Sequence, residues 1–296
     1  MSHDGSSYYG RPILKEPVWK PEVPCYFFTG GLAGASSVLS LAARLTGNER
    51  LAKTSLYVGL AAEVASPALL ISDLGRPERF LNMLRVLKPT SPMSVGSWVL
   101  VASGGATTTA AACELLGVAP RLKAAAELAS AVAGAPLAVY TATLVSNTAV
   151  PVWHEGRREL PFVFAAASAA SAGAAATLLL SPRDAAPARR LAAAGALVAE
   201  AVAAGMRRRL GLVGEVYDRG PAARFDRLAK TASLSGAVLL ARGREQRVAA
   251  VAGAALVLGG GLARRFSVFR AGFQSARDPR YTVEPQRARL EAASAG

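Results

Sequence analysis

The charged residues of this chain are separated by long apolar runs, and this pattern predicts membrane-spanning helices. Four stretches contain no Asp, Glu, Lys or Arg: Val23–Ala43, Ser91–Cys113, Leu128–Trp153 and Leu160–Pro182. A helix that rises 1.5 Å per residue needs about 20 apolar residues to cross the hydrocarbon core of a bilayer. Each stretch is long enough, so the sequence predicts an all-α fold, a polytopic bundle of transmembrane helices.

Five spans are well defined by this pattern, and three are weaker. The well-defined spans are expected at Val23–Ala43, Thr54–Ser72, from Met93 onward, Leu128–Val150 and Pro161–Leu180. The weaker ones are expected at Leu191–Met206, Thr231–Ala241 and Val248–Ala263. By length alone, Thr231–Ala241 would be an interfacial or re-entrant segment, because so short a run cannot cross the hydrocarbon.

The polar ends of the chain define its organisation. Residues 1–22 are expected to form an extramembrane segment, 23–265 the helix bundle and 266–296 a polar tail. The Arg-rich tail is expected to be extended or disordered and outside the bilayer. The N-terminal segment is polar and rich in proline, with no apolar core, so no cleavable signal peptide is expected.

The net charge of +14 does not indicate a nucleic-acid-binding protein. The basic residues fall in short loops between spans without interleaved aromatic residues, which is the pattern of membrane topology. The two cysteines, Cys25 and Cys113, and the two histidines, His3 and His154, are too few and too scattered for a disulfide framework, a metal site or a bis-histidine haem. We therefore expect no haem or metal bound by this chain.

Glu63 lies near the centre of the second span and is the sharpest candidate for chemistry. A carboxylate at this depth costs a few kcal/mol, so it is normally protonated, paired or exposed to a wet cavity. A proton relay and a protonated Glu bonded to a neighbouring Ser or Thr both fit. Glu114 and Glu200 raise the same question nearer to helix ends or on weaker spans.

The second span ends in the turn Asp73-Leu74-Gly75-Arg76-Pro77. Gly75 permits a left-handed helix end, and Pro77 prevents the helix from continuing. An ordinary helix cap with an Asp73–Arg76 ion pair explains the pattern, and so does a functional turn.

Aromatic and polar residues mark the first and fourth spans. Tyr140, inside the fourth span, can donate a hydrogen bond to a ligand or to a backbone carbonyl. Tyr26 opens the first span, where an aromatic belt is expected. The fourth span closes with Asn147, Trp153 and His154, of which Trp153 is expected to anchor at the interface and His154 to lie in a solvated loop.

Four motifs between Trp19 and Ala176 occur in the order of a known family. They are Tyr26-Phe27-Phe28-Thr29-Gly30-Gly31-Leu32-Ala33-Gly34, the Asp73–Pro77 turn, Ser91-Pro92-Met93-Ser94-Val95-Gly96-Ser97-Trp98, and Tyr140-Thr141 followed by Pro151-Val152-Trp153. With them the chain resembles the NrfD / polysulphide-reductase family of quinone-reactive membrane subunits. Val95 departs from the motif, which often carries Trp there.

The resemblance implies an eight-helix subunit without haem that binds menaquinone or ubiquinone. It also implies a ferredoxin-type iron–sulfur partner, which in turn contacts a catalytic subunit such as a molybdopterin enzyme of the formate dehydrogenase type. Tyr140 corresponds to a recurrent quinone ligand, and Tyr26 corresponds more loosely. We assign quinone contact to Tyr140, Tyr26, Arg76 and Asn147, and proton transfer to Glu63 and Asp73.

The function implied is that of a membrane subunit in a respiratory oxidoreductase complex, which passes electrons between the iron–sulfur partner and quinone and is not catalytic alone. A passive membrane anchor and a proton or ion transporter are the alternatives. Against a transporter, the sequence shows no inverted repeat with paired broken helices. Most of the 34 Lys and Arg fall in loops on the side of the N-terminus. The positive-inside rule then predicts the cytoplasmic (inner) membrane, with the N-terminal and partner-docking face in the cytoplasm.

Overall fold

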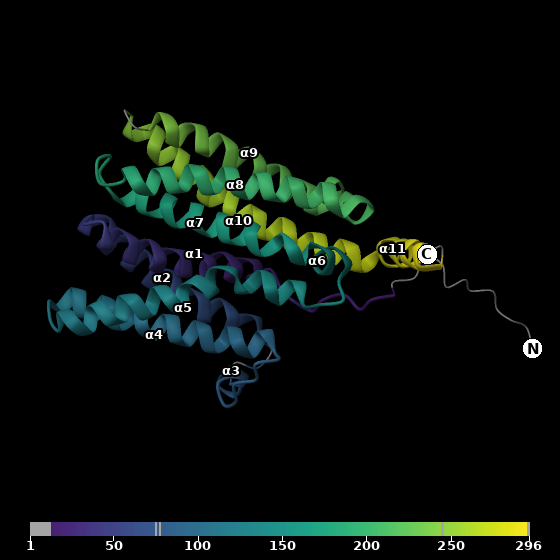
Figure 1. Ribbon diagram of the computed structural model, residues 1–296, viewed down its shortest axis with the longest axis horizontal. Helices are drawn as coiled ribbons and strands as arrows, with labels where there is room; N and C mark the ends of the chain where they lie inside the picture. Colours follow the sequence, from purple (N-terminus) through teal and green to yellow (C-terminus); the bar gives the residue numbers. More distant parts are fainter. Residues whose placement is uncertain (1–12, 75, 77, 244–245, 295–296) are drawn as a thin grey trace, which may run out of the picture.

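The computed structural model describes residues 13–74, 76, 78–243 and 246–294, and every regular element in these residues is a helix. Long helices lie side by side in one bundle (Figure 1). They are α1 (Glu22–Leu45), α2 (Glu49–Asp73), α4 (Pro92–Leu116), α5 (Pro120–Ser146), α7 (Leu160–Leu179), α8 (Ala186–Leu210), α9 (Gly220–Arg242) and α10 (Arg247–Arg277). The predicted all-α bundle of about eight helices is confirmed. Of these, all but α8 and α9 are both long and apolar enough to span a membrane.

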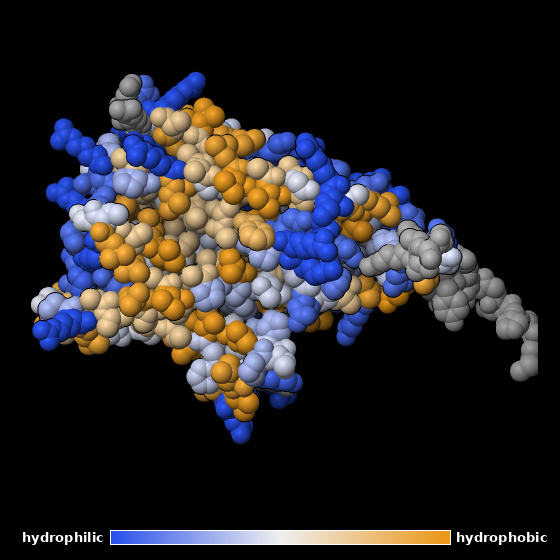
Figure 2. Space-filling view, in the orientation of Figure 1, coloured by the Kyte–Doolittle hydropathy of each residue, from blue (hydrophilic) through white to orange (hydrophobic). Residues whose placement is uncertain are grey.

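The two ends of the bundle differ in structure (Figure 1). At one end the chain forms α3 (Arg79–Met83), α6 (Pro151–Glu155), η1 (Gly156–Arg158), η2 (Gly211–Asp218) and α11 (Arg280–Ser294). We call this end the N-terminal face, because residues 13–21 also lie there, and the other end the opposite face. Figure 2 shows apolar residues over the middle of the visible surface, with charged residues gathered toward both ends.

The helices form two groups of four. In the first group α1 packs on α2 and α5, and α4 packs on α5 and α2. In the second, α7 packs on α8 and α10, and α9 packs on α10 and α8. The groups meet where α1 and α5 contact α7. Glycine allows the closest crossing in the first group, since a β-carbon at Gly34 of α1 would lie 2.2 Å from the backbone oxygen of Gly134 of α5.

Several helices extend beyond the predicted spans. α5 begins at Pro120 and ends at Ser146, whereas the uncharged run predicted Leu128–Val150. α9 runs from Gly220 to Arg242, so the short run predicted at Thr231–Ala241 is the C-terminal half of a longer helix. An uncharged run marks the part of a helix suited to hydrocarbon, whereas charged residues with good helix propensity extend the same helix at its ends.

The expectation of an extended or disordered tail after Phe266 is also wrong. α10 continues to Arg277, and α11 follows at Arg280–Ser294. The reason is burial: Val268, Phe269 and Ala271 prolong the apolar face of α10 and are at most 2% exposed. Two polar residues of this stretch, Ser267 and Ser275, are buried as well, and each is hydrogen-bonded to the backbone.

Candidate functional site

Two tyrosines from different helices meet inside the first helix group. The hydroxyl of Tyr26 on α1 donates a hydrogen bond to the hydroxyl of Tyr140 on α5 at 3.3 Å. Tyr26 is 2% exposed, so it belongs to the core rather than to an aromatic belt. Tyr140 is half-buried. Tyr26 lies in the second turn of α1 and Tyr140 two turns before the end of α5, which places both toward the N-terminal face.

The Ser91–Trp98 motif packs directly on this pair. Ser91 caps α4 by accepting a hydrogen bond from the Ser94 backbone N–H at 3.4 Å, and Pro92 occupies the first turn. This start brings Gly96 against the ring of Tyr140, where an added β-carbon would lie 2.0 Å from a ring atom. The motif therefore supplies the flat surface on which the tyrosine rests.

Hydroxyl groups of α1 and α2 lie next to Tyr26. The Ser66 hydroxyl donates to Thr29 Oγ1 at 2.9 Å, and Thr29 Oγ1 donates to the Tyr26 carbonyl at 3.3 Å. A β-carbon at Gly30 would lie 3.8 Å from the Tyr26 ring and 4.0 Å from Ser66 Oγ. The first-span motif thus brings a polar edge of α2 close to the tyrosine pair.

Glu63 lies one turn deeper than Ser66 on α2 and is 4% exposed. The Ser103 hydroxyl of α4 donates to its Oε1 atom. Among the described residues its Oε2 atom has no hydrogen-bond partner. Gly104 leaves room beside this carboxyl, because a β-carbon there would sit 3.5 Å from Oε2. Glu63 is therefore bonded to a neighbouring Ser, which agrees with one of the two alternatives that the sequence left open.

The remaining predicted site residues lie at the rim of the N-terminal face. Asp73 ends α2, and its Oδ1 atom accepts a hydrogen bond from the Lys20 backbone N–H at 3.0 Å. The expected Asp73–Arg76 ion pair is not formed among the described residues, because Leu74 is extended and Arg76 is exposed. Gly75 and Pro77, on which the predicted turn also depends, lie outside the described residues.

The positions of Asn147, Trp153 and His154 agree only in part with the sequence predictions. Asn147 is the exposed C-cap of α5, with its backbone N–H bonded to Thr143 O at 3.0 Å. Trp153 is fully buried, stacks on Trp19 with ring centroids 5.4 Å apart, and donates to Val268 O at 2.7 Å. Its expected role as an interface anchor is therefore wrong. His154 is exposed, as expected.

An ion cluster in the second helix group was missed by the sequence reasoning. Arg264 of α10 donates to both oxygens of Glu200 on α8 at 2.8 and 2.6 Å, and it also bonds Asp226 of α9. Arg207 of α8 pairs with the same Asp226. The predicted span ended at Ala263, immediately before Arg264. Glu200 gave the available signal, because an acid within a span requires a counter-charge.

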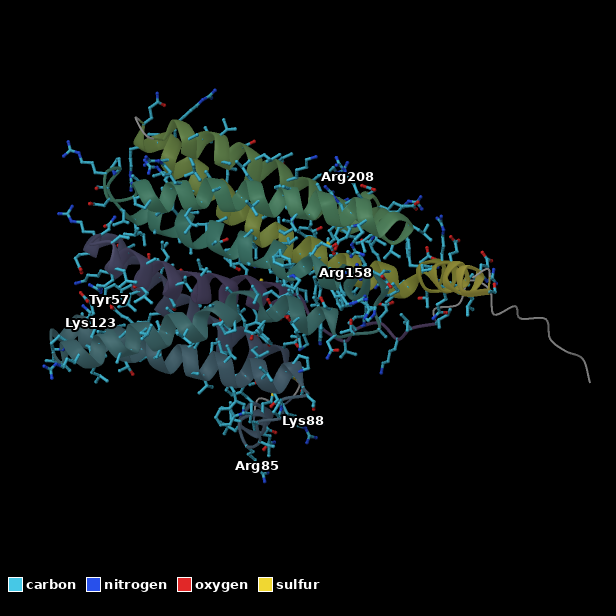
Figure 3. The ribbon with its side chains drawn as sticks, viewed as in Figure 1. Tyr57, Arg85, Lys88, Lys123, Arg158 and Arg208 are labelled. Carbon is cyan, nitrogen blue, oxygen red and sulfur yellow. The ribbon has the colours of Figure 1, made fainter. Side chains whose placement is uncertain are left out.

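Glu114 belongs to a second cluster at the opposite face. Arg44 of α1 contacts Glu127 Oε1 at 2.6 Å and Glu114 Oε2 at 3.3 Å, and Lys123 also pairs with Glu114. Glu127 is 4% exposed although it precedes the uncharged run of its helix. Figure 3 shows Lys123 and Tyr57 at this end of the bundle, far from Arg85 and Lys88.

The tyrosine pair fits a quinone head group chemically. The Tyr140 hydroxyl accepts from Tyr26, so its own proton is left to donate to a further acceptor such as a carbonyl oxygen. Leu69, Leu70, Val99 and Leu144 belong to the apolar cluster that holds both tyrosines. A quinone carbonyl would find one hydroxyl donor here, in an apolar surround.

A family model described as "Polysulphide reductase, NrfD" matches residues 14–206 of the chain. The match includes all of the predicted site residues and extends from before α1 into the last turns of α8. No curated protein matches the chain.

Proposed function

Because the chain belongs to the polysulphide reductase NrfD family, we propose that it is the quinone-reactive membrane subunit of an oxidoreductase complex. It is a multi-pass membrane protein, with six helices able to span a bilayer by length and composition. In the proposed function, electrons pass between an iron–sulfur partner at the N-terminal face and a menaquinone or ubiquinone at the tyrosine pair.

The observation that carries this proposal is the Tyr26–Tyr140 hydroxyl pair in the membrane-embedded bundle. When bound there, a quinone supplies a carrier that takes up or releases electrons and protons within the hydrocarbon. Tyr140 binds and orients a carbonyl oxygen through its hydroxyl. Tyr26 fixes the direction of that hydroxyl, and Gly96 fixes the plane of the Tyr140 ring. Tyr26 is therefore a positioning residue as much as a ligand.

Two carboxyl groups on α2 support proton exchange at this site. Glu63 lies one turn below Ser66 on α2, and Asp73 lies at the rim of the N-terminal face beside Lys20. Arg76 and Asn147 are exposed at that rim. In this proposal they would contact a quinone at the rim rather than at the tyrosine pair.

The N-terminal face is the proposed docking surface for a ferredoxin-type iron–sulfur subunit. α3 projects from the bundle there (Figure 1). Arg85 and Lys88 follow it and are exposed, and Arg158 and Arg208 also point outward toward this end (Figure 3). Basic residues on a flat surface attract an acidic partner and orient it. Through that subunit the chain would serve a catalytic subunit of the molybdopterin type, for example a formate dehydrogenase.

The test is Tyr140→Phe in the complex purified through a tag on this chain, with a reduced viologen dye as electron donor and a soluble quinone analogue as acceptor. Loss of one neutral hydrogen bond, about 1 kcal/mol, should lower quinone turnover roughly fivefold while the complex still assembles. Tyr57→Phe is the matched control, because Tyr57 lies on α2 near the opposite face (Figure 3). Equal turnover in both variants would remove Tyr140 as a ligand. A wild-type complex without quinone turnover would favour the passive anchor.

A further inference from the structure

Buried hydroxyl and carboxyl groups form a column along the axis of the first helix group. The column begins at the opposite face with Arg44 and Glu127, whose Nε–Oε2 and Nη2–Oε1 distances are 3.2 and 2.6 Å. Lys53 beside this pair is 54% exposed, so water reaches this end. Arg44 of α1 is the charged group in contact with Glu127, and it also contacts Glu49 of α2 and Glu114 of α4. Glu114 in turn pairs with Lys53 of α2 and Lys123 of α5.

Three hydroxyls continue the column into the membrane. Ser130 is one turn from Glu127 on α5, so their side chains share one face of the helix. The Ser130 hydroxyl lies 2.6 Å from Thr107 Oγ1 of α4, which lies 3.4 Å from Ser37 Oγ of α1. All three are at most 2% exposed. Hydroxyl contacts across helices are common in membrane bundles, and here three different helices contribute one hydroxyl each to a single cluster.

The column then reaches the candidate site. Ser103 lies one turn from Thr107 on α4 and donates to Glu63. From Glu63 the next polar group on α2 is Ser66, which is bonded to Thr29, and Thr29 is in turn bonded to the Tyr26 carbonyl. The Glu63 Oε2 atom without a described partner thus sits between the hydroxyls and the tyrosine pair.

We propose that this column carries protons between the opposite face and the tyrosine pair. The inference rests on the proposed function for the use of those protons. A Ser or Thr hydroxyl can accept one proton and donate another, so a file of them passes a proton without holding a net charge. Three steps of one helical turn remain: from Glu127 to Ser130, from Thr107 to Ser103 and from Glu63 to Ser66. A rotating hydroxyl or a single water bridges such a distance.

This route brings electrons and protons to the site from opposite faces of the membrane. Electrons reach the tyrosine pair from the N-terminal face, whereas protons reach it from the opposite face. Quinone reduction therefore moves positive charge from the opposite face toward the site, and quinol oxidation moves it back. Proton entry from the N-terminal face, past Asp73, is the alternative that the experiment separates.

The test uses Thr107→Val with Thr108→Val as its matched control. Both replace a hydroxyl by a methyl group, but Thr107 is fully buried in the column and Thr108 is exposed. The complex is reconstituted in phosphatidylcholine–phosphatidylglycerol liposomes with the pH set separately on each side. We expect wild-type turnover to follow the pH at the opposite face. Thr107→Val and Glu63→Gln should slow turnover roughly tenfold, by removing one step of the relay, and abolish that dependence. Thr108→Val and Thr107→Ser, which keep the column hydroxyl, should behave as wild type.

A measurement without quinone keeps this inference separate from the proposed function. Dicyclohexylcarbodiimide adds to protonated carboxyl groups, and mass spectrometry locates the adduct. Labelling of Glu63 in the reconstituted chain should follow the pH of the opposite face in wild type and lose that dependence in Thr107→Val. Labelling that follows the pH of the N-terminal face, or that is the same in both threonine variants, would overturn the column even if quinone turnover is normal. If Glu63 labelling follows the pH of the opposite face but the complex shows no quinone turnover, the proton column is supported and the proposed function is contradicted.

Discussion

Gly96 on α4 faces the ring of Tyr140 on α5 so closely that a β-carbon at Gly96 would come within 2.0 Å of Cε2 and 2.2 Å of Cζ. No rotation of a methyl group relieves such an overlap, so any other residue at Gly96 must displace the tyrosine. Two motifs that are far apart in the sequence are therefore one structural unit. The glycine sets where the Tyr140 hydroxyl points.

Gly96→Ala should lower quinone turnover at least as much as Tyr140→Phe, because the ring must move away from Tyr26. Gly105→Ala on the same helix is the control, since nothing lies within 4 Å of its added β-carbon. Turnover and the amount of assembled complex should be measured together. Normal turnover in Gly96→Ala would show that the Tyr140 position is not required.

Much of the fold could be predicted because the helices are fixed by local hydropathy. The uncharged runs predict the cores of α1, α4, α5 and α7 directly, and the apolar residues on both sides of Glu63 predict α2. The ends of α5, α9 and α10 could not be predicted in this way, because charged residues there are neutralised by partners far away in the sequence. Arg264 is the clearest case, since its partners Glu200 and Asp226 are on two other helices.

Part of the site could be predicted too, because its motifs are local in the sequence. Family motifs identify Tyr26 and Tyr140 individually, but their contact depends on how α1 crosses α5 at Gly34 and Gly134. Trp153 looks like an interface anchor by sequence position, and only its stacking on Trp19 makes it a core residue. Contacts between helices are set by packing, which a single sequence does not reveal.

The buried cluster around Arg264 should control stability. Arg264→Met leaves Glu200 and Asp226, at 8% and 3% exposed, with one counter-charge removed. Breaking a buried pair in this way costs about 3–5 kcal/mol, so the thermal midpoint of the purified chain in detergent should fall clearly. Arg50→Ala removes a pair whose arginine is 76% exposed, and it should change stability by less than about 1 kcal/mol. Similar shifts in the two variants would contradict the cluster's role.

The contact between Glu16 and Arg277 should respond to acid. The hydrogen bond from Arg277 lowers the pKa of Glu16 from its ordinary value. A lowered pKa in the folded state means that the contact stabilises the fold above the ordinary pKa and is lost as the pH falls through the lowered one. Residues 13–20 should therefore loosen as the pH falls below the ordinary range of a glutamate carboxyl. Fluorescence of Trp19 and Trp153 in a Trp98→Phe background reports this change. Glu16→Gln should show the fluorescence of the loosened segment already at pH 7. Fluorescence that changes neither with acid nor with this substitution would show that the Glu16–Arg277 contact does not hold residues 13–20.

The orientation of the bundle decides which compartment holds the partner and which supplies the protons. Most of the 34 Lys and Arg lie in segments at the N-terminal face, among them Arg85, Lys88, Arg158 and Arg208. At the opposite face Arg44, Arg50 and Lys123 are each paired with a carboxylate. Orientation follows the number of basic residues in short loops, with little effect from acidic ones. The count still favours the N-terminal face, so we predict that this face is cytoplasmic.

Reporter fusions test this prediction at two places chosen from the structure. An alkaline phosphatase fused after Val118, in the turn between α4 and α5, should be active because that turn is at the opposite face. The same reporter fused after Gly296 should be silent, since the chain returns to the N-terminal face through α10 and α11 (Figure 1). A reversed pattern would place the partner outside and the proton entry of the column in the cytoplasm. Equal activity at both sites would contradict the five crossings between the α4–α5 turn and the end of the chain (α5, α7, α8, α9 and α10), because an odd number of crossings places the two sites on different faces.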